Sequence, residues 1–287
     1  MNENKIVITG ANGQLGQALQ LRFPNAVATD RNELDITDKE SVENFDWSNK
    51  EIIINAAAYT NVDGAETPEG KELAQKINVN GVQNLTEAAK KHNLTMVHIS
   101  SDYVFDGTKK DHFESEEISP ISVYGKTKAE GDELVMNLPK KYILRTSWVI
   151  GDGKNFVRTM LNLGAKGISP KVVNDQFGRL TFTDELVRAI EYLISVKADY
   201  GLYNVTNSGP IMSWAEITEE IFSDAGFKDL GVGHISTAEY FDGKEGIAPR
   251  PVNSDLNLDK IHNTGFKSKN WQDELKDYIM KEINTVS

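Results

Sequence analysis

The sequence predicts an α/β fold built on a doubly wound parallel sheet, with a smaller C-terminal region interleaved with that sheet. Two observations predict this class. Short apolar runs alternate with amphipathic helical patterns along the first half of the chain, and strands buried on both faces of a parallel sheet form continuous apolar runs of this kind. No linker or low-complexity segment divides the 287 residues. The parts of the chain are therefore expected to pack as one unit.

The elements of the first half follow in regular order. The first strand is expected in "KIVITG", and a helix follows in "QLGQALQLRF". A long helix is predicted in "GKELAQKINVNGVQNLTEAAKKHN" and another in "VYGKTKAEGDELV", from Val123 to Val135. Further strands are predicted in "NAVATD", "EIIINAAAY", "LTMVHIS" and "KYILRTSWVIG".

After about Gly151 the alternation loosens. Amphipathic helices are predicted in "NFVRTMLNLGAKG", "TDELVRAIEYLISV", "SWAEITEEIFSDAGF" and "WQDELKDYIMKEI". Only shorter strands such as "KVVN" lie between them. This half is therefore expected to form the smaller region beside the main sheet.

A glycine loop joins the first strand to the first helix. "VITGANGQLGQAL" places Gly10, Gly13 and Gly16 where the backbone must turn tightly and approach a pyrophosphate at a helix N-terminus. Asp30 ends the next strand. Its separation from Gly10 along the sequence is about that at which an acid binds the adenosine ribose in dinucleotide folds. An ordinary glycine turn is the alternative. The position of the loop favours a Rossmann-type dinucleotide-binding fold.

The residues that follow the second strand leave the choice of cofactor open. Asp30 favours NAD, because an acid can bind the free 2′-hydroxyl of its ribose. The adjacent Arg31 favours NADP, because a guanidinium can pair with a 2′-phosphate. We expect residues 1–150 to form the dinucleotide-binding domain, with part of 171–205 returning to it, and residues 151–287 to form mainly a substrate-binding region.

The helix from Val123 sets a phenol and an ammonium one turn apart. Tyr124 and Lys128 are at i and i+4 and therefore share a helix face. A free tyrosine has a pKa near 10, and a nearby ammonium lowers it by favouring the phenolate. Such a tyrosine can pass a proton to a carbonyl oxygen as hydride arrives at the carbon. A surface tyrosine beside a solvated lysine is the alternative, which the glycine loop upstream disfavours.

A third member of the site is expected at the end of a neighbouring strand, because α/β sites collect at the carboxyl ends of strands. "MVHISSDYVFDG" supplies Ser100, Ser101 and Asp102 there. A hydroxyl at this point could bind and orient a substrate carbonyl. A Ser-Asp turn that merely caps the strand is the alternative, for Ser100 in particular.

Composition excludes several classes of partner. The net charge is −12 and the pI about 5.0, so a nucleic-acid backbone would be repelled. No apolar run approaches the roughly 20 residues of a membrane span, and "MNENKIVITG" lacks the features of a signal peptide. The chain has no cysteine and five scattered histidines, so no metal site is expected. These features predict a cytoplasmic protein and leave a homodimer open.

Seven motifs together resemble a known family. "TGANGQLG", "INAAAYTNVDGAE", "HISSDYVFDG", "SVYGKTKAEGDEL", "LRTSWVIG", "VVNDQFG" and "APRPVNSDLN" occur in this order and span almost the whole chain. They closely resemble the dTDP-4-dehydrorhamnose reductases, an extended branch of the short-chain dehydrogenase/reductases. One departure is clear: the family usually has "DQxGxPT" where this chain has "DQFGRLTF", with Leu180 in place of the proline.

The resemblance implies a role for each matching residue. Tyr124 would be the proton donor, Lys128 its partner and ribose clamp, and Ser101 a hydroxyl that is a threonine in many relatives. With the glycine loop, it implies cofactor contacts at Gly10, Asn12, Gly13, Gln14, Leu15, Gly16, Asp30, Arg31, Asp35, Ile36, Ala58, Tyr59, Thr60, Tyr124 and Lys128. The implied substrate contacts are Val62, Ser101, Asp102, Tyr103, Trp148 and Arg250. Trp148 as a core aromatic and Arg250 as a surface ion pair are the alternatives.

The activity implied by the resemblance is reduction of the C4 keto group of dTDP-4-dehydro-L-rhamnose, with NADP favoured over NAD as cofactor. The product would be dTDP-L-rhamnose for cell-surface polysaccharide. A related sugar-nucleotide reductase or epimerase is one alternative. A regulatory subunit resembling that of methionine adenosyltransferase is the other. The presence of Tyr124, Lys128 and Ser101 together argues against a pure binding module.

Overall fold

A computed structural model describes residues 2–286 of the chain. Its centre is a six-stranded sheet in the order β10-β5-β4-β3-β1-β2, and every pair of neighbouring strands is parallel. The strands are β1 (Ile6–Thr9), β2 (Val27–Thr29), β3 (Ile52–Asn55), β4 (Thr95–Ser101), β5 (Lys141–Thr146) and β10 (Gly201–Asn204). This confirms the predicted α/β class.

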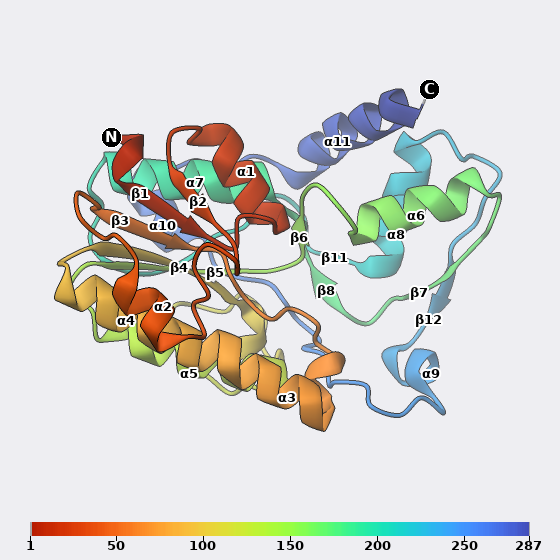
Figure 1. Ribbon diagram of the computed structural model, residues 1–287. Coiled ribbons are helices and arrows are strands. Elements are labelled where there is room, and N and C mark those ends of the chain that lie inside the picture. Colours follow the sequence, from red (N-terminus) through yellow and green to blue (C-terminus); the bar gives the residue numbers. More distant parts are fainter. Residues whose placement is uncertain (1, 287) are drawn as a thin grey trace.

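Helices cover both faces of this sheet (Figure 1). One face carries α1 (Gln14–Arg22), α7 (Thr183–Ser195) and α10 (Asp259–Asn263). The other face carries α2 (Lys39–Asn44), α3 (Pro68–Gln75), α4 (Val82–Lys91) and α5 (Val123–Met136). Four single-turn or π-helical segments, η1 (Glu3–Lys5), η2 (Gly64–Glu66), η3 (Lys76–Gly81) and η4 (Asp102–Val104), complete this part of the fold.

The alternation of side chains along β1 explains why its first three residues are all apolar. Ile6 and Ile8 pack into the core on the α1–α7 side, whereas Val7 packs into the core under α2, α4 and α5. A parallel strand covered on both faces has no polar side. The continuous apolar runs of the sequence follow from this double burial.

The direction of winding reverses between β1 and β3. From β1 the chain passes first to β2 on one side, and then returns to β3 on the other side. At such a switch point the connections leave the strand ends in opposite directions, which opens a crevice at their carboxyl ends. Gly10 follows β1 and Ala56 follows β3 at this point.

A second, smaller part lies beyond the carboxyl ends of the strands (Figure 1). Its core joins α6 (Phe156–Ala165), α8 (Trp214–Asp224) and α11 (Trp271–Val286). Short strands pair within it: β6 (Val149–Ile150) with β9 (Thr181–Phe182), β7 (Lys171–Val173) with β12 (Gly233–Ile235), and β8 (Phe177–Gly178) with β11 (Met212–Ser213), while α9 (Thr237–Phe241) lies beside β7. Leu180 is fully buried in this core.

Two elements differ from those expected from the sequence, and a third is present as predicted. The helix predicted over 70–93 is divided into α3 and α4 by the π-helical turn η3. The strand predicted over 141–151 ends at Thr146, because Trp148 adopts a left-handed backbone with φ 49°. The short strand predicted in "KVVN" is present as β7 and pairs with β12 in the smaller part of the molecule.

No helix within residues 2–286 is long and apolar enough to cross a membrane.

Candidate active site

The glycine loop lies at the switch point, and its backbone is in close contact with the segment that follows β3. Gly10 has φ 72°, and a Cβ built there would lie 2.6 Å from the Ala57 amide nitrogen. A Cβ at Gly16 would overlap the Gly10 carbonyl oxygen. Gly13 is the N-cap of α1 and makes no side-chain cap hydrogen bond. The loop therefore leaves helix-terminal N–H groups without a side-chain cap at the place where an anionic pyrophosphate fits.

A first cavity of about 290 Å³ opens beside this loop. It is lined by the ends of β1, β2 and β3 and by the first residues of η3. Of the predicted cofactor residues, it contains Gly10, Asn12, Gly13, Asp30, Arg31, Asp35, Ile36 and Ala58. These residues fit the adenosine half of a dinucleotide.

The two residues that bear on cofactor choice are held differently. The Asp30 carboxylate accepts hydrogen bonds from the Asn12 side chain at 2.5 Å and from the Asn32 N–H at 2.7 Å. The Asn32 N–H is the largest of the hydrogen bonds that lower the pKa of Asp30. Arg31 pairs with Asp35 at 3.1 Å, and its side chain is otherwise exposed. Arg31 can therefore leave this weak surface pair for a phosphate.

A second cavity of about 500 Å³ continues from the first and shares Gly13, Ala56, Ala57 and Ala58 with it. It is lined from the carboxyl ends of β3, β4 and β5 and from α5. Of the predicted residues, it contains Gly13, Gln14, Leu15, Ala58, Thr60, Val62, Ser101, Asp102, Tyr103, Tyr124, Lys128 and Trp148. Residues far apart in sequence therefore meet in one space.

Tyr124 enters this cavity from the first turn of α5. The helix begins there because Ser122 caps it, accepting from the Gly125 N–H at 3.0 Å. The Tyr124 ring meets the Tyr103 ring edge-on, with centroids 5.4 Å apart. One turn further, the Lys128 ammonium donates to the Ile99 carbonyl oxygen at 2.7 Å.

Burial dominates the electrostatics of this pair. It raises the pKa of Tyr124 to about 12, and Ser101 opposes that rise. It also lowers the pKa of Lys128 to about 8, and the Asp132 carboxylate opposes that fall. The sequence predicted that the ammonium would lower the phenol's pKa. In the structure burial raises the pKa of Tyr124 instead, and at neutral pH the phenol holds its proton and can donate it.

Ser101 and Asp102 follow β4 and are both buried. The Ser101 hydroxyl donates to the Asp102 carboxylate at 3.0 Å and accepts from the Tyr103 N–H at 3.2 Å. Burial raises the pKa of Asp102 to about 6, against the hydrogen bonds from Ser254 and Ser101. Ser101 thus caps a turn and also faces the cavity, so the two interpretations of this residue are compatible.

Trp148 lines the cavity in a strained conformation that its neighbours maintain. Its indole stacks on Trp214 with centroids 3.7 Å apart. On Gly178, an added Cβ would lie 2.9 Å from the indole ring. A non-glycine residue with positive φ at a cavity wall is typical of a functional position.

Three predicted site residues lie outside both cavities. Gly16 contacts the Gly10 carbonyl and shapes the loop. The Tyr59 backbone binds Asn78, donating to its side chain at 2.8 Å. Arg250 forms an ion pair with Asp63 at 2.8 Å, which is the alternative weighed from the sequence.

Several residues that line the cavities were not predicted from the sequence. Lys76 brings an ammonium side chain to the first cavity from η3. Thr146 and Ser147 line the second cavity, and their buried hydroxyl oxygens have no hydrogen-bond partner within the part of the chain that is described. Their place at the end of β5 was the available signal, because strand ends gather in such sites.

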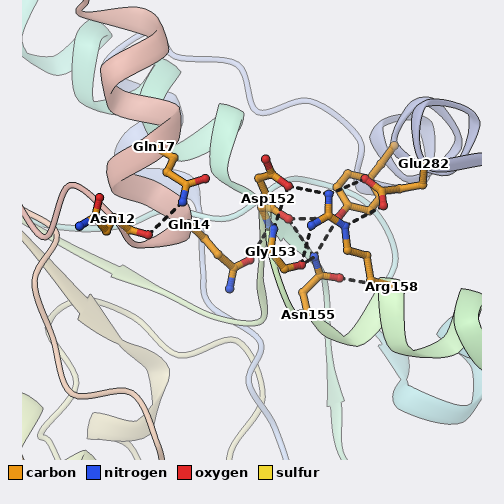
Figure 2. A network of polar contacts seen from close by, with 10 residues as sticks. Asn12, Gln14, Gln17, Asp152, Gly153, Asn155, Arg158 and Glu282 are labelled. Carbon is orange, nitrogen blue, oxygen red and sulfur yellow. Dashed lines mark hydrogen bonds and ion pairs between the residues drawn. The ribbon is translucent and has the colours of Figure 1, made fainter. Parts of the chain in front are cut away.

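A polar network ties the glycine loop to the smaller part of the molecule (Figure 2). The Gln14 side chain accepts from the Gly151 N–H at 2.8 Å. The Gly151 carbonyl accepts from Asn155 at 2.8 Å and from the Tyr278 hydroxyl at 3.0 Å. Arg158 then joins α6 to Glu282 of α11. The start of α1 and the C-terminal helix are therefore linked through one backbone position.

Among residues 2–286, no cluster of three or more His, Asp or Glu side chains could hold a metal ion.

A glycine loop at the switch point and a Tyr-Lys pair in the adjoining cavity define the class of the protein: it is a Rossmann-type oxidoreductase. The family can be stated more closely. The model of the family described as "RmlD substrate binding domain" matches residues 4–284, and the chain belongs to that family.

Individual relatives agree with this assignment. The chain is 41% identical to a dTDP-4-dehydrorhamnose reductase of Aggregatibacter actinomycetemcomitans, over 95% of this chain and 97% of the relative. A crystal structure of such a reductase from Clostridium acetobutylicum has 41% identity and a TM-score of 0.88, covering 96% of this chain and 98% of that one. A third, from Bacillus anthracis in complex with NADP, has 36% identity and a TM-score of 0.88, covering 98% and 99%. The resemblance drawn from the motifs is confirmed.

Proposed function

We propose that this protein catalyses the NADPH-dependent reduction of the C4 keto group of dTDP-4-dehydro-L-rhamnose to give dTDP-L-rhamnose. The observation that carries the proposal is the second cavity. Tyr124, Lys128 and Ser101 line it together, and it joins the glycine-loop cavity at Gly13. A proton donor and a dinucleotide site thus share one continuous space.

The cofactor would be held along both cavities. The uncapped N–H groups at the start of α1, with Gly13 as N-cap, would bind the pyrophosphate. Asp30, Arg31 and Lys76 would surround the adenosine ribose. When bound, the nicotinamide supplies the hydride. We favour NADP(H) because two cationic side chains, Arg31 and Lys76, line the adenosine cavity and can neutralise a 2′-phosphate.

Tyr124 would deliver the proton. Because its pKa of about 12 keeps the phenol neutral at pH 7, the hydroxyl is ready to donate to the carbonyl oxygen. The Ser101 hydroxyl would bind the same oxygen and orient it. The Lys128 ammonium, one helical turn away, would stabilise the phenolate that forms as the proton leaves.

The sugar nucleotide would lie on the side of the cavity that faces the smaller part. We assign substrate contacts there to Val62, Ser101, Asp102, Tyr103 and Trp148, with the Arg250–Asp63 pair at the outer rim. By this proposal residues 1–150, with part of 171–205, form the dinucleotide-binding domain. Residues 151–287 then mainly bind substrate.

The same proposal includes a cytoplasmic location and an active unit that can be a homodimer. Size-exclusion chromatography with light scattering tests the second part.

The deciding experiment follows NADPH oxidation by absorbance with freshly prepared dTDP-4-dehydro-L-rhamnose, with NADH and a UDP-sugar analogue in parallel. We expect rapid oxidation that depends on the dTDP sugar. Tyr124→Phe should lower turnover by about 10³-fold and leave cofactor binding unchanged. Bound cofactor without net oxidation would overturn the proposal in favour of an epimerase or a regulatory subunit. Near-normal turnover by Tyr124→Phe would refute the assignment of the proton donor.

A further inference from the structure

A buried polar cluster lies behind Lys128, and the reaction as described makes no use of it. It consists of Asp132 on α5, His98 on β4 and Arg145 on β5. The three residues are 2%, 0% and 4% exposed. Burying an ionised carboxylate and a guanidinium costs desolvation free energy. Their presence in the core therefore indicates that they have a function.

The contacts within the cluster point toward Asp132. The Arg145 Nε donates to one carboxylate oxygen of Asp132 at 3.2 Å. The His98 Nε2 lies 3.8 Å from the other oxygen, Oδ1. That oxygen has no hydrogen-bond partner within the described residues. Asp132 is thus a carboxylate held from one side by a cation and approached from the other by an imidazole.

The orientation of His98 follows from Asn55. The Asn55 Oδ1 accepts from the Thr9 hydroxyl at 2.7 Å and from the Ala57 N–H at 3.2 Å. Its amide nitrogen therefore faces the His98 Nδ1, at 3.1 Å, and donates to it. The Nε2 of His98 then carries the imidazole proton and faces Asp132. Burial lowers the pKa of His98 well below its usual value, so the ring is neutral.

This arrangement connects the cluster with both ends of the cofactor cavity. Thr9 immediately precedes the glycine loop, and Asn55 ends the strand that leads to Ala56 and Ala57. On α5, Asp132 is four residues beyond Lys128, which is four beyond Tyr124. Residues at this spacing lie on one helix face. Tyr124, Lys128 and Asp132 therefore form a row from the cavity into the core.

We propose that Asp132, held in place by a hydrogen bond from Arg145 and faced by His98, is a positioning residue that keeps the Lys128 ammonium charged beneath the proton donor. The inference rests on the proposed reductase function, since it assigns Lys128 the task of stabilising the Tyr124 phenolate. Lys128 itself is 2% exposed, and within residues 2–286 its ammonium hydrogen-bonds to the neutral Ile99 carbonyl. A carbonyl supplies no charge, so the counter-charge must come from Asp132.

The charges around these groups determine the direction of the effect. Asp132 faces Lys128 on its own helix, Arg145 from β5 and the neutral His98 from β4. Lys128 faces Tyr124 and Asp132 on α5, and the Ile99 carbonyl and the neutral His98 on β4. Replacing Asp132 by Asn leaves two buried cations without a counter-charge. The pKa of Lys128, now about 8, should fall further, and the ammonium is lost at a lower pH.

The test is the pH profile of kcat/KM for reduction of the dTDP sugar. In Asp132→Asn the alkaline limb should move to lower pH by about one unit or more. Asp132→Glu, which retains the charge, should restore the limb toward its wild-type position. Glu130→Gln is the matched control, because Glu130 is an exposed acid on the same helix. It should leave the limb in place, since solvent screens that charge.

A second readout needs neither cofactor nor turnover. Carbon-13 NMR of protein labelled at the lysine Cε atoms, titrated across pH, reports when each amine loses its proton and needs no reagent to reach the buried Lys128. Lys126 is exposed and serves as an internal reference. We expect the Lys128 transition to move to lower pH in Asp132→Asn, while the Lys126 transition stays fixed.

If Asp132→Asn does not fold, Asp132→Asn/Arg145→Met removes both charges of the pair, and the same shift is expected because Lys128 still loses its counter-charge. An unchanged Lys128 transition in the variant that folds would overturn the inference.

A wild-type enzyme with no sugar-dependent oxidation would refute the proposed function instead. The NMR titration of Lys128 would still decide the role of Asp132 in that case.

Discussion

Arg145 and Arg158 each pair with carboxylates, but one pair lies inside the fold and the other near its surface. The side chains of Arg145 and Asp132 are 5% and 3% exposed, whereas those of Arg158 and its partner Asp152 are 28% and 71% exposed. Arg158 also donates two hydrogen bonds to Glu282. The first pair adjoins the Tyr-Lys row, and the second belongs to the network through Gly151 (Figure 2).

The difference shows how burial changes what a charge does. In the core the effective dielectric is low, so a single carboxylate can alter the ionisation of its neighbours. Near the surface water and salt screen the charges, and the contribution of an ion pair is mainly geometric. We infer that the buried cluster acts on chemistry, while the half-buried network through Gly151 aligns α1 with α6 and α11.

The largest effect is expected from breaking the buried pair. Arg145→Met removes the cation that hydrogen-bonds to the Asp132 carboxylate in the core and leaves only the Lys128 ammonium facing it. The free energy of unfolding should fall by about 3–5 kcal/mol, measured by urea denaturation. A loss below about 1 kcal/mol would mean that the pair stabilises the fold no more than a surface ion pair does. Burial would then not explain the difference between Arg145 and Arg158.

The next effect concerns Asp102, whose buried carboxyl has a pKa of about 6. Because protonation removes the charge-assisted hydrogen bonds it can accept, KM for the sugar nucleotide should rise about tenfold as pH falls through 6. Asp102→Asn should have a high KM that does not vary with pH. Protonation of Asp152 should not change KM over this pH range, because hydrogen bonding from Arg158 lowers the pKa of Asp152 and keeps it ionised. A wild-type KM that is flat between pH 5 and pH 7 would contradict the assignment of Asp102 as a substrate contact.

A smaller effect is expected at the junction between the two parts. Gln14→Ala removes the acceptor of the buried Gly151 N–H. An unsatisfied donor of this kind should cost about 1 kcal/mol of unfolding free energy. Gln17→Ala is the matched control on the same helix, because the Gln17 side chain donates to the Asn12 carbonyl on the exposed side. Equal losses in the two variants would show that the junction has no special role.

The smallest effect is expected from Arg158→Met. The unfolding free energy should fall by about 0.2–1 kcal/mol, and high salt should reduce the difference from wild type. Parallel urea titrations at low and high salt provide the measurement. A loss as large as that of Arg145→Met would show that the half-buried ion pairs of Arg158 stabilise the fold as strongly as the buried pair of Arg145.

Much of the fold and part of the site could be predicted because their signals are local. The continuous apolar runs of β1 and β3 reflect burial on both faces. The spacing of Tyr124 and Lys128 places them on one helix face wherever that helix lies. Glycine is required at Gly10 because the backbone there has φ 72°. Each signal depends on neighbouring residues alone.

Other features depend on segments that meet only in the folded chain. The π-helical turn η3 was not predicted, although it brings Lys76 to the first cavity. The stack of Trp148 on Trp214 joins residues from β5's end and from α8. No periodicity relates such positions, because side-chain contacts between distant segments are set by packing and not by backbone propensity.

The sequence by itself therefore determined the parallel α/β fold, the glycine loop and the helix that carries Tyr124 and Lys128. Only the tertiary structure decided the electrostatics of that pair. It buried the phenol, which raises its pKa, and it set Asp132 between Lys128, His98 and Arg145. The physical reason is that desolvation and the field of a buried charge depend on what surrounds a group in space, which the order of residues along the chain does not state.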